Sequence, residues 1–225
     1  MRKIMLIDDR TIRQIKFMEE TGIDINAFSD VMDNFTDDKY EVLLDEFRND
    51  NFSILNNYDV IITHRSAYGE INSKVLDKFK EICKQEKKSL VFFSGGISSI
   101  TYFKQPFEFL LVNSQMFYSK TLELFLENYK ETFKVNILQI PYGNRWNINI
   151  LLNTLEKINR YIGENLEKQS VSYIKFKIDV ELKNLNDILD YEEPKLENGM
   201  ISMETLKHFS QNLSNQIKKK VVINV

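Results

Sequence analysis

Residues 59 to 66 read DVIITHRS, a run of apolar and β-branched side chains from Val60 to Thr63 that ends at polar residues beginning with His64. Two other stretches repeat this design: KIMLI from Lys3 to Ile7, and KSLVFF from Lys88 to Phe93. Continuous apolar runs of this length are typical of strands that are covered on both faces. Such strands occur in parallel sheets with helices on either side, so the three stretches predict an α/β fold.

The segments between these strands have the periodicity of helices. In the segment Ser73–Gln85, apolar residues recur every three or four positions, which places them on one face of a helix. Similar helices are predicted at Thr11–Glu20, Asp37–Asn49 and Lys120–Glu131, with a further strand at Phe107–Val112 and a short strand within Ile23–Met32. Alternating strands and helices predict a doubly wound, mostly parallel sheet over residues 1–132.

The second half, residues 133–225, is expected to be a C-terminal α/β extension. Strands are predicted at 135–140 (VNILQI) and 221–225 (VVINV), helices at 147–167 and 202–218, and a loop at 192–199. The segment 172–182 fits both a half-buried strand and a helix, and we favour the strand because β-branched and aromatic residues are enriched there. No Gly-, Ser- or Pro-rich linker separates the halves, so the extension is expected to pack on the first domain.

Composition limits the chemistry that this chain can support. The 225 residues include 43% hydrophobic residues, which are enough for a sizeable core, but only two His and one Cys. This scarcity excludes a disulfide scaffold and a Cys/His zinc module. The net charge of −3 gives no reason to expect nucleic acid as a partner, and no stretch approaches the about 20 apolar residues of a membrane-spanning helix. The lone thiol of Cys83 fits a reducing compartment, so a cytoplasmic location is expected.

Polar residues stand at the carboxyl ends of four predicted strands. They are Asp8-Asp9, the segment 63–66, Ser94-Gly95-Gly96 and the segment 113–115. In a parallel α/β sheet, functional groups gather at this edge. These residues are therefore the candidates for a functional site.

This layout resembles the receiver domain of two-component response regulators over about residues 1–130. In that family an acidic pair after the first strand binds magnesium, which the resemblance implies for Asp8 and Asp9. Ser94 followed by Gly95 matches the Ser or Thr and small residue that follow the fourth strand. Two positions depart from the family pattern: His64 stands where the phosphoacceptor aspartate belongs, and Gln115 stands where a lysine belongs.

The two departures change the function that the resemblance implies. A histidine cannot form an acyl phosphate, and the lost carboxylate is also a lost magnesium ligand. The chain therefore looks like a degenerate receiver, or pseudo-receiver. The leading hypothesis is a regulatory or protein-interaction module that binds a protein partner; a homo-oligomer is compatible with it. Enzymatic activity is left open, and the incomplete set of catalytic residues weighs against it.

The alternative hypothesis is a magnesium-dependent or nucleotide-binding enzyme or ligand binder that uses the same strand ends. Asp8 and Asp9 would hold Mg²⁺, His64 would act as a general base in hydrolysis or phosphoryl transfer, and Ser94, Gly95 and Gly96 would cradle an anion. Each group also has a structural interpretation that the sequence leaves open. The acidic pair could cap a helix, His64 could be a hydrogen-bonded structural imidazole, and the Ser-Gly-Gly turn could serve only the chain reversal.

Overall fold

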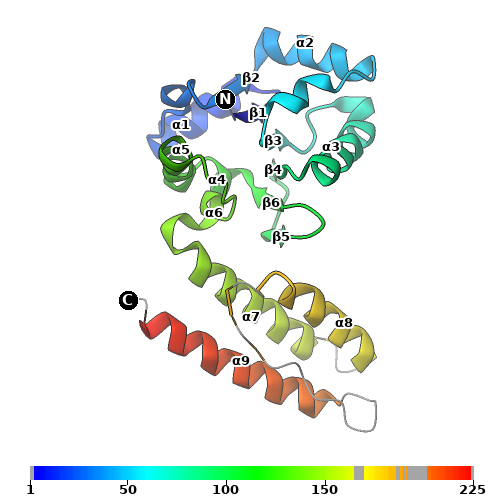
Figure 1. The fold of residues 1–225 in the computed structure, drawn as a ribbon, viewed down its shortest axis with the longest axis vertical. Helices are drawn as coiled ribbons and strands as arrows, with labels where there is room; N and C mark the ends of the chain where they lie inside the picture. The colour runs from blue at the N-terminus through cyan, green and yellow to red at the C-terminus, as the bar shows by residue number, and fades with distance from the viewer. Residues whose placement is uncertain (1–2, 165–169, 186–187, 190, 192–201, 224–225) are drawn as a thin grey trace. The chain divides into compact units, whose positions relative to one another are not determined.

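The computed structural model describes residues 3–164, 170–185, 188–189, 191 and 202–223. The chain divides into two compact units, Met1–Asn144 and Arg145–Val225, and each is described here by itself (Figure 1). The division lies after Asn144, later than the predicted residue 132, because a short helix, α6 (Gln139–Tyr142), packs against the last long helix of the first unit. The predicted loop at 192–199 lies outside the described residues.

The first unit is built on a six-stranded, mostly parallel sheet, which confirms the α/β class. The strands are β1 (Ile4–Ile7), β2 (Met32–Phe35), β3 (Val60–His64), β4 (Ser89–Ser94), β5 (Thr101–Phe103) and β6 (Phe109–Asn113). Their order is β2-β1-β3-β4-β6-β5, and only β5 is antiparallel to its neighbour. Strands predicted at KIMLI, DVIIT, KSLVFF and Phe107–Val112 all take part.

Helices cover both faces of this sheet. They are α1 (Thr11–Thr21), α2 (Asp37–Arg48), α3 (Asn72–Glu86), α4 (Ser114–Phe117) and α5 (Lys120–Thr132), with short 3₁₀ helices at Ile25–Phe28, Ser53–Asn57, Gly69–Ile71 and Gly143–Arg145. Figure 1 shows α2 and α3 on one side of the strands, and α1 and α5 on the other. The four long helices of this unit agree closely with the predicted ranges.

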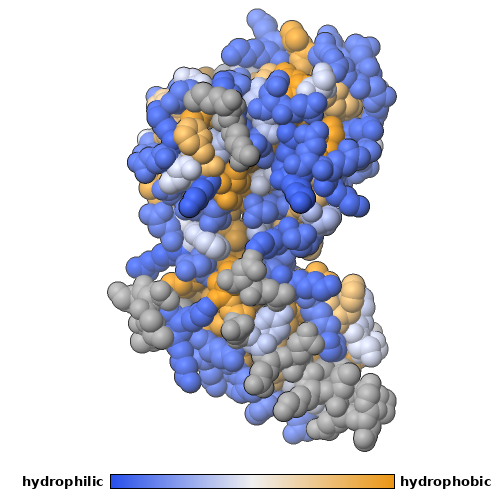
Figure 2. Space-filling view, in the orientation of Figure 1, coloured by the Kyte–Doolittle hydropathy of each residue, from blue (hydrophilic) through white to orange (hydrophobic). Residues whose placement is uncertain are grey.

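The face under α2 and α3 holds an apolar core. Its centre is an aromatic cluster of Phe47, Phe52, Tyr68 and Phe79, all buried. The ring of Phe47 stacks on Phe52 at 4.8 Å between centroids and meets Phe79 edge-on at 5.5 Å, the two favoured geometries for aromatic pairs. The visible surface of this unit, by contrast, is mainly polar (Figure 2).

Register in the central strands decides which side chains meet at the carboxyl edge of the sheet, which we call the crest. Ile7 of β1 lies opposite Thr63 of β3, so Asp8 comes level with His64. His64 in turn lies opposite Phe93 of β4, and the two rings are 5.4 Å apart. The parallel pairing thus brings the end of β1 and the end of β3 to one point.

Two sequence predictions in the first unit are corrected, and one strand was not predicted. The short strand expected within Ile23–Met32 begins only at Met32, because a 3₁₀ helix (Ile25–Phe28) precedes it. The strand expected at 135–140 does not form; those residues form turns and the start of α6. The outer edge beside β6 is taken instead by β5, which the sequence did not reveal because it is only three residues long.

The described part of the second unit is helical, so the expected α/β character of the extension is wrong there. It contains α7 (Trp146–Glu164), α8 (Val171–Leu182) and α9 (Met203–Ile223). The segment 172–182 is a helix rather than a strand, since Ile174, Ile178 and Leu182 form a buried stripe at four-residue spacing. The closing strand is also wrong for residues 221–223, which continue α9, while 224–225 lie outside the described residues.

Candidate functional site at the sheet crest

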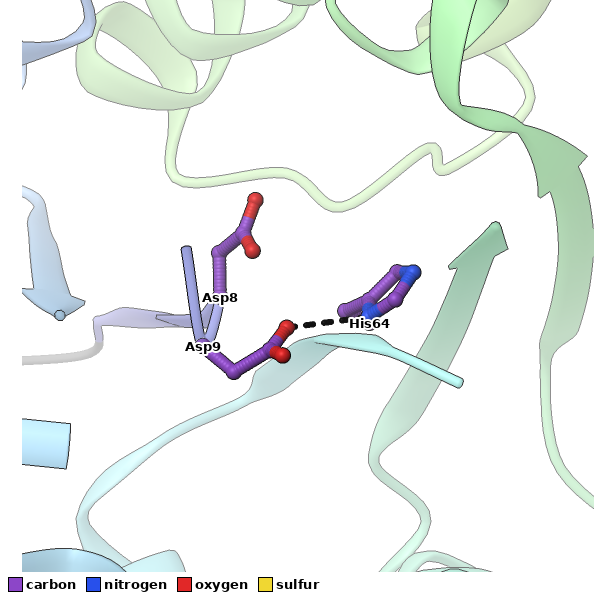
Figure 3. Close-up of side chains that lie close together, drawn as sticks. All are labelled: Asp8, Asp9 and His64. Atoms are coloured by element: carbon purple, nitrogen blue, oxygen red, sulfur yellow. Dashed lines mark hydrogen bonds and ion pairs between the residues drawn. The ribbon is translucent and has the colours of Figure 1, made fainter. Parts of the chain in front are cut away.

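Three predicted site residues meet at the crest. Asp8 and Asp9 follow β1, His64 ends β3, and each offers one ligand atom within 4.8 Å of the others. Figure 3 shows His64 and Asp9 turned toward each other, with His64 Nδ1 3.0 Å from Asp9 Oδ1. The strand-end rule therefore located the cluster correctly.

Asp8 is completely buried, and its charge is compensated on every side. The hydroxyl of Tyr118 donates to Oδ2 at 2.6 Å, and the backbone N–H of Arg10 donates to Oδ1 at 3.1 Å. The guanidinium of Arg13 donates to both oxygens, with Nε 3.3 Å from Oδ2. A buried carboxylate is tolerated only with partners of this kind.

Arg13 links the two acids. It lies in the first turn of α1, four residues after Asp9, and its Nη2 atom is 2.8 Å from Asp9 Oδ1 while also contacting Asp8. One guanidinium thus lies between two carboxylates. Burial alone would lower the pKa of Arg13, but the hydrogen bonds and charges of Asp8 and Asp9 raise it above its usual value.

Asp9 is held in its ionised form. Burial on its own would raise the pKa of this carboxyl, but hydrogen bonds and positive charge from His64 and Arg13 lower it well below its usual range. Because an ionised carboxylate only accepts, the His64 contact requires a proton on Nδ1. The Nε2 atom of the ring points away from Asp9 (Figure 3) and has no hydrogen-bond partner in the described part of the chain.

A pocket of about 730 Å³ opens beside this cluster. Its lining comes from the ends of β1, β3 and β4, from the first residues of α2 and α4, and above all from α1. The lining residues are Asp9, Arg10, Thr11, Ile12, Arg13, Lys16, Phe17, Asp37, His64, Gly95 and Ser114. The volume falls within the range of small-molecule sites. The crest therefore offers both a charged cluster and space for a ligand.

The Ser-Gly-Gly turn contributes less than predicted. Gly95 lines the pocket, but Ser94 and Gly96 do not. Side chains alternate along a strand, so Ser94 follows Phe92 toward the α2 and α3 face, away from the face shared by Phe93 and His64. Gly95 and Gly96 also do not adopt the positive φ that would suit an anion cradle.

The position that the resemblance assigned to a lysine is exposed. Gln115 lies in α4, after β6 ends at Asn113, and does not line the pocket. Its neighbour Ser114 does, and the Ser114 hydroxyl is buried without a hydrogen-bond partner among the described residues. The described residues that line the pocket thus include no lysine from this strand end.

The predicted magnesium site does not fit the residues as they are arranged. Asp8 and Asp9 are the ligands that Mg²⁺ would prefer, but Arg13 already lies between them and pairs with both. Asp8 also accepts bonds from Tyr118 and from the Arg10 amide. A divalent ion could reach both carboxylates only after Arg13 had moved away.

Two important residues were missed from sequence. Arg13 carries a detectable signal, because it stands four residues after Asp9 at the start of a predicted helix. Tyr118 carries none, since it is 110 residues from Asp8 and reaches it only through the packing of α4. The ring of Tyr118 is fixed by stacking on Phe17 of α1 at 5.1 Å.

No protein-family model, curated protein or solved structure matches this chain. In the described parts of both units, no helix is long and apolar enough to cross a lipid bilayer. A functional assignment therefore rests on the geometry of the crest.

Proposed function

We propose that the unit of residues 1–144 is a pseudo-receiver: a regulatory, protein-interaction module with a doubly wound, flavodoxin-like sheet. The five parallel strands lie in the order β2-β1-β3-β4-β6, and the antiparallel β5 is added at the edge. If the parallel strands alone are numbered along the chain, β6 is the fifth and the order is 2-1-3-4-5. That order is shared by flavodoxin-like and receiver folds. The order supports the fold assignment alone, and the function is argued from the crest.

The observation that carries the proposal is the position of Arg13. Its guanidinium pairs with Asp8 and Asp9 at once and supplies the positive charge that a bound cation would supply in a receiver. Unlike a metal ion, a side chain cannot leave, so the charge at the crest is constant. A fixed ion pair supports a module whose state does not depend on magnesium or on phosphorylation.

His64 supports the same conclusion. It occupies the end of β3, and its Nδ1 hydrogen bond to Asp9 fixes the ring in place. There is no carboxylate at this position to accept a phosphoryl group as an acyl phosphate. Signalling by this module would therefore pass through a partner that recognises its surface.

A first experiment tests the closed cation site. Calorimetry with Mg²⁺ should show no binding to the wild-type chain, whereas Arg13→Ala frees two carboxylates beside His64 and should gain measurable Mg²⁺ binding. Arg10→Ala is the matched control, because Arg10 contacts Asp9 only at 3.6 Å and is mostly exposed. Wild-type binding of Mg²⁺ that is lost in Asp9→Asn would contradict the proposal.

A second experiment tests the regulatory role. A partner isolated with the tagged full-length chain should form the complex again from purified components, with equal affinity with or without Mg²⁺ and acetyl phosphate. The proposal fails if those two additions change the affinity tenfold or more.

A second candidate function, small-ligand binding, is favoured by the pocket beside His64. The enzymatic form of this idea has less support, because Ser94 lies outside the pocket and the acids are already paired. Binding without chemistry needs only a lined cavity with free polar groups, and the pocket beside His64 offers both.

A further inference from the structure

We propose that the pocket at the start of α1 binds a phosphate monoester carried on a small organic body, with the phosphoryl group at the helix N-terminus and the organic body along Ile12 and Phe17. This inference does not depend on the pseudo-receiver proposal. It rests on the cavity, on unpaired hydrogen-bonding groups in its wall, and on the spacing of cations along α1.

The N-terminus of α1 is uncapped where it meets the pocket. The N-cap residue Arg10 makes no side-chain capping bond, and the first turn contains no acidic residue. The amides of Thr11 and Ile12 have no hydrogen-bond acceptor among the described residues, since the first helical bonds come from Arg13 and Gln14. Free amides and the helix dipole together favour an anion at this position.

Three cationic side chains recur along the same side of α1. Arg10, Arg13 and Lys16 are spaced three residues apart, and all three line the pocket. Arg13 is used by Asp8 and Asp9, but the side chains of Arg10 and Lys16 are 72% and 71% exposed. Within the described residues, Arg10 pairs only with Asp9 at 3.6 Å and Lys16 only with Glu20 at 3.7 Å. Both retain donors for a ligand.

Two polar groups in the pocket wall lack partners among the described residues, and the buried Ser114 hydroxyl is an independent sign of a ligand. His64 is 8% exposed, and its Nε2 atom is unpartnered among the described residues. Ser114 is 3% exposed, and its hydroxyl has no described partner. Native proteins leave few buried polar groups unsatisfied, and such exceptions are common where a ligand supplies the missing bond.

The acidic residues that line the pocket do not cancel its preference for an anion. Asp9 is already paired with Arg13 and His64, and Asp37 accepts a hydrogen bond from the Thr11 hydroxyl at 2.7 Å. The unused groups are mainly donors: two amides, a guanidinium and an ammonium. His64 Nε2 is a further unused group, and it suits a hydroxyl on the organic body of the ligand, which can both donate and accept a hydrogen bond.

The apolar part of the lining argues for an organic body and against a bare ion. Ile12 is 83% exposed although it is a large hydrophobic residue, and it lies at the pocket with Phe17. Inorganic phosphate would leave both side chains uncovered, and would occupy a small part of about 730 Å³. A mononucleotide or a sugar phosphate fits both the volume and the polarity.

Calorimetry on the full-length chain at low ionic strength tests the proposal with two pairs of probes: AMP against adenosine, and ribose 5-phosphate against ribose. At least one phosphate should bind with a Kd below about 1 mM, and its phosphate-free partner should not. AMP alone would assign a nucleotide, whereas binding of both phosphates would assign a sugar phosphate. Arg10→Gln and Lys16→Gln should each weaken binding about threefold to fivefold, as expected for one mostly exposed charged contact.

Lys84→Gln is the matched control, since Lys84 is an exposed cation of α3 outside the pocket, and it should bind like the wild type. The proposal is overturned if neither phosphate binds, if adenosine or ribose binds as tightly as its phosphate, or if Arg10→Gln and Lys16→Gln leave the affinity unchanged. Equal weakening by Lys84→Gln would show nonspecific charge attraction and would overturn it as well.

Discussion

The two faces of the central sheet both bury apolar side chains, and they differ in the buried charge that the face under α1 and α5 carries at the crest. Under α2 and α3, the space is filled by the buried and closely packed rings of the aromatic cluster, Phe47, Phe52, Tyr68 and Phe79. Under α1 and α5, the same strands end in Asp8, whose buried charge depends on Arg13 and Tyr118. Apolar contact area stabilises both faces, since Leu6 and Phe125 are also fully buried on the second. The second face in addition keeps a polar network at the crest, at some cost in stability.

The aromatic cluster and the ionic network differ in how they respond when one of their side chains is removed. An apolar core loses contact area when a side chain is shortened, and its neighbours relax partly into the space. A buried ionic network loses compensation, because the remaining charge cannot return to water. The two faces should therefore respond differently to substitution, and four measurements compare them.

The largest loss of stability is expected in the aromatic cluster. Phe47→Ala removes a fully buried ring from the aromatic cluster and should lower the free energy of unfolding by about 3–5 kcal/mol. Denaturant titration measures this, with Phe103→Ala, at a partly exposed ring of β5, as a control that should lose much less. Equal losses in the two variants would contradict the packing described here.

The second largest loss of stability is expected for Arg13→Met. It leaves Asp8 buried without its charged partner and should cost about 3 kcal/mol, near the lower end for broken buried pairs because Asp9 remains partly accessible. Adding Asp8→Asn to this variant should recover part of the loss, since the uncompensated charge is then gone. If the double variant is less stable than Arg13→Met alone, the network interpretation is wrong.

Tyr118→Phe tests a single bond of the network. The ring and its stacking on Phe17 remain, and only the hydroxyl that donates to Asp8 is removed. The expected loss is about 1.5 kcal/mol, typical of a hydrogen bond to a charged group. Tyr173→Phe, at an exposed tyrosine of α8, should change the stability little. A similar loss in both variants would contradict a stabilising role for the bond from Tyr118 to Asp8.

The smallest effect is a pH dependence at Asp9. The pKa of this carboxyl is lowered in the folded chain from an ordinary value of 3.8, so its ionised form stabilises the fold above about pH 4. That contribution is lost as the pH falls below 4 toward the lowered pKa. The stability difference between wild type and Asp9→Asn should thus shrink between about pH 5 and pH 3. An unchanged difference over this interval would argue against the pairing of Asp9 with Arg13 and His64.

The sequence was informative where local pattern and tertiary role coincide. Strands β1, β3 and β4 are covered on both faces, so their apolar runs are continuous. Because the strands are parallel, the polar residues that follow these runs all lie at the crest. This is why Asp8, Asp9 and His64 could be found before the structure. Ser94 lies outside the pocket because the alternation of side chains along β4 assigns its last residue to the other face of the sheet.

The remaining failures have two physical causes, one that lies far along the chain and one within α8. Tyr118 reaches Asp8 through tertiary packing, which local periodicity does not report. In α8, Phe176 is 61% exposed, so its place in the alternating pattern reflects no burial. Ile174, Ile178 and Leu182 form the buried helical stripe, and the exposed aromatic residue between them produced the false strand pattern.

The two apolar sides of α8 also matter before the chain is folded. A segment that alternates apolar and charged residues, with several β-branched side chains, can pair with copies of itself as extended chains when nothing covers it. In the native unit α8 packs against α7, which buries one side and holds the helix. The contact with α7 that holds α8 as a helix therefore also removes the same twelve residues from extended pairing with other chains.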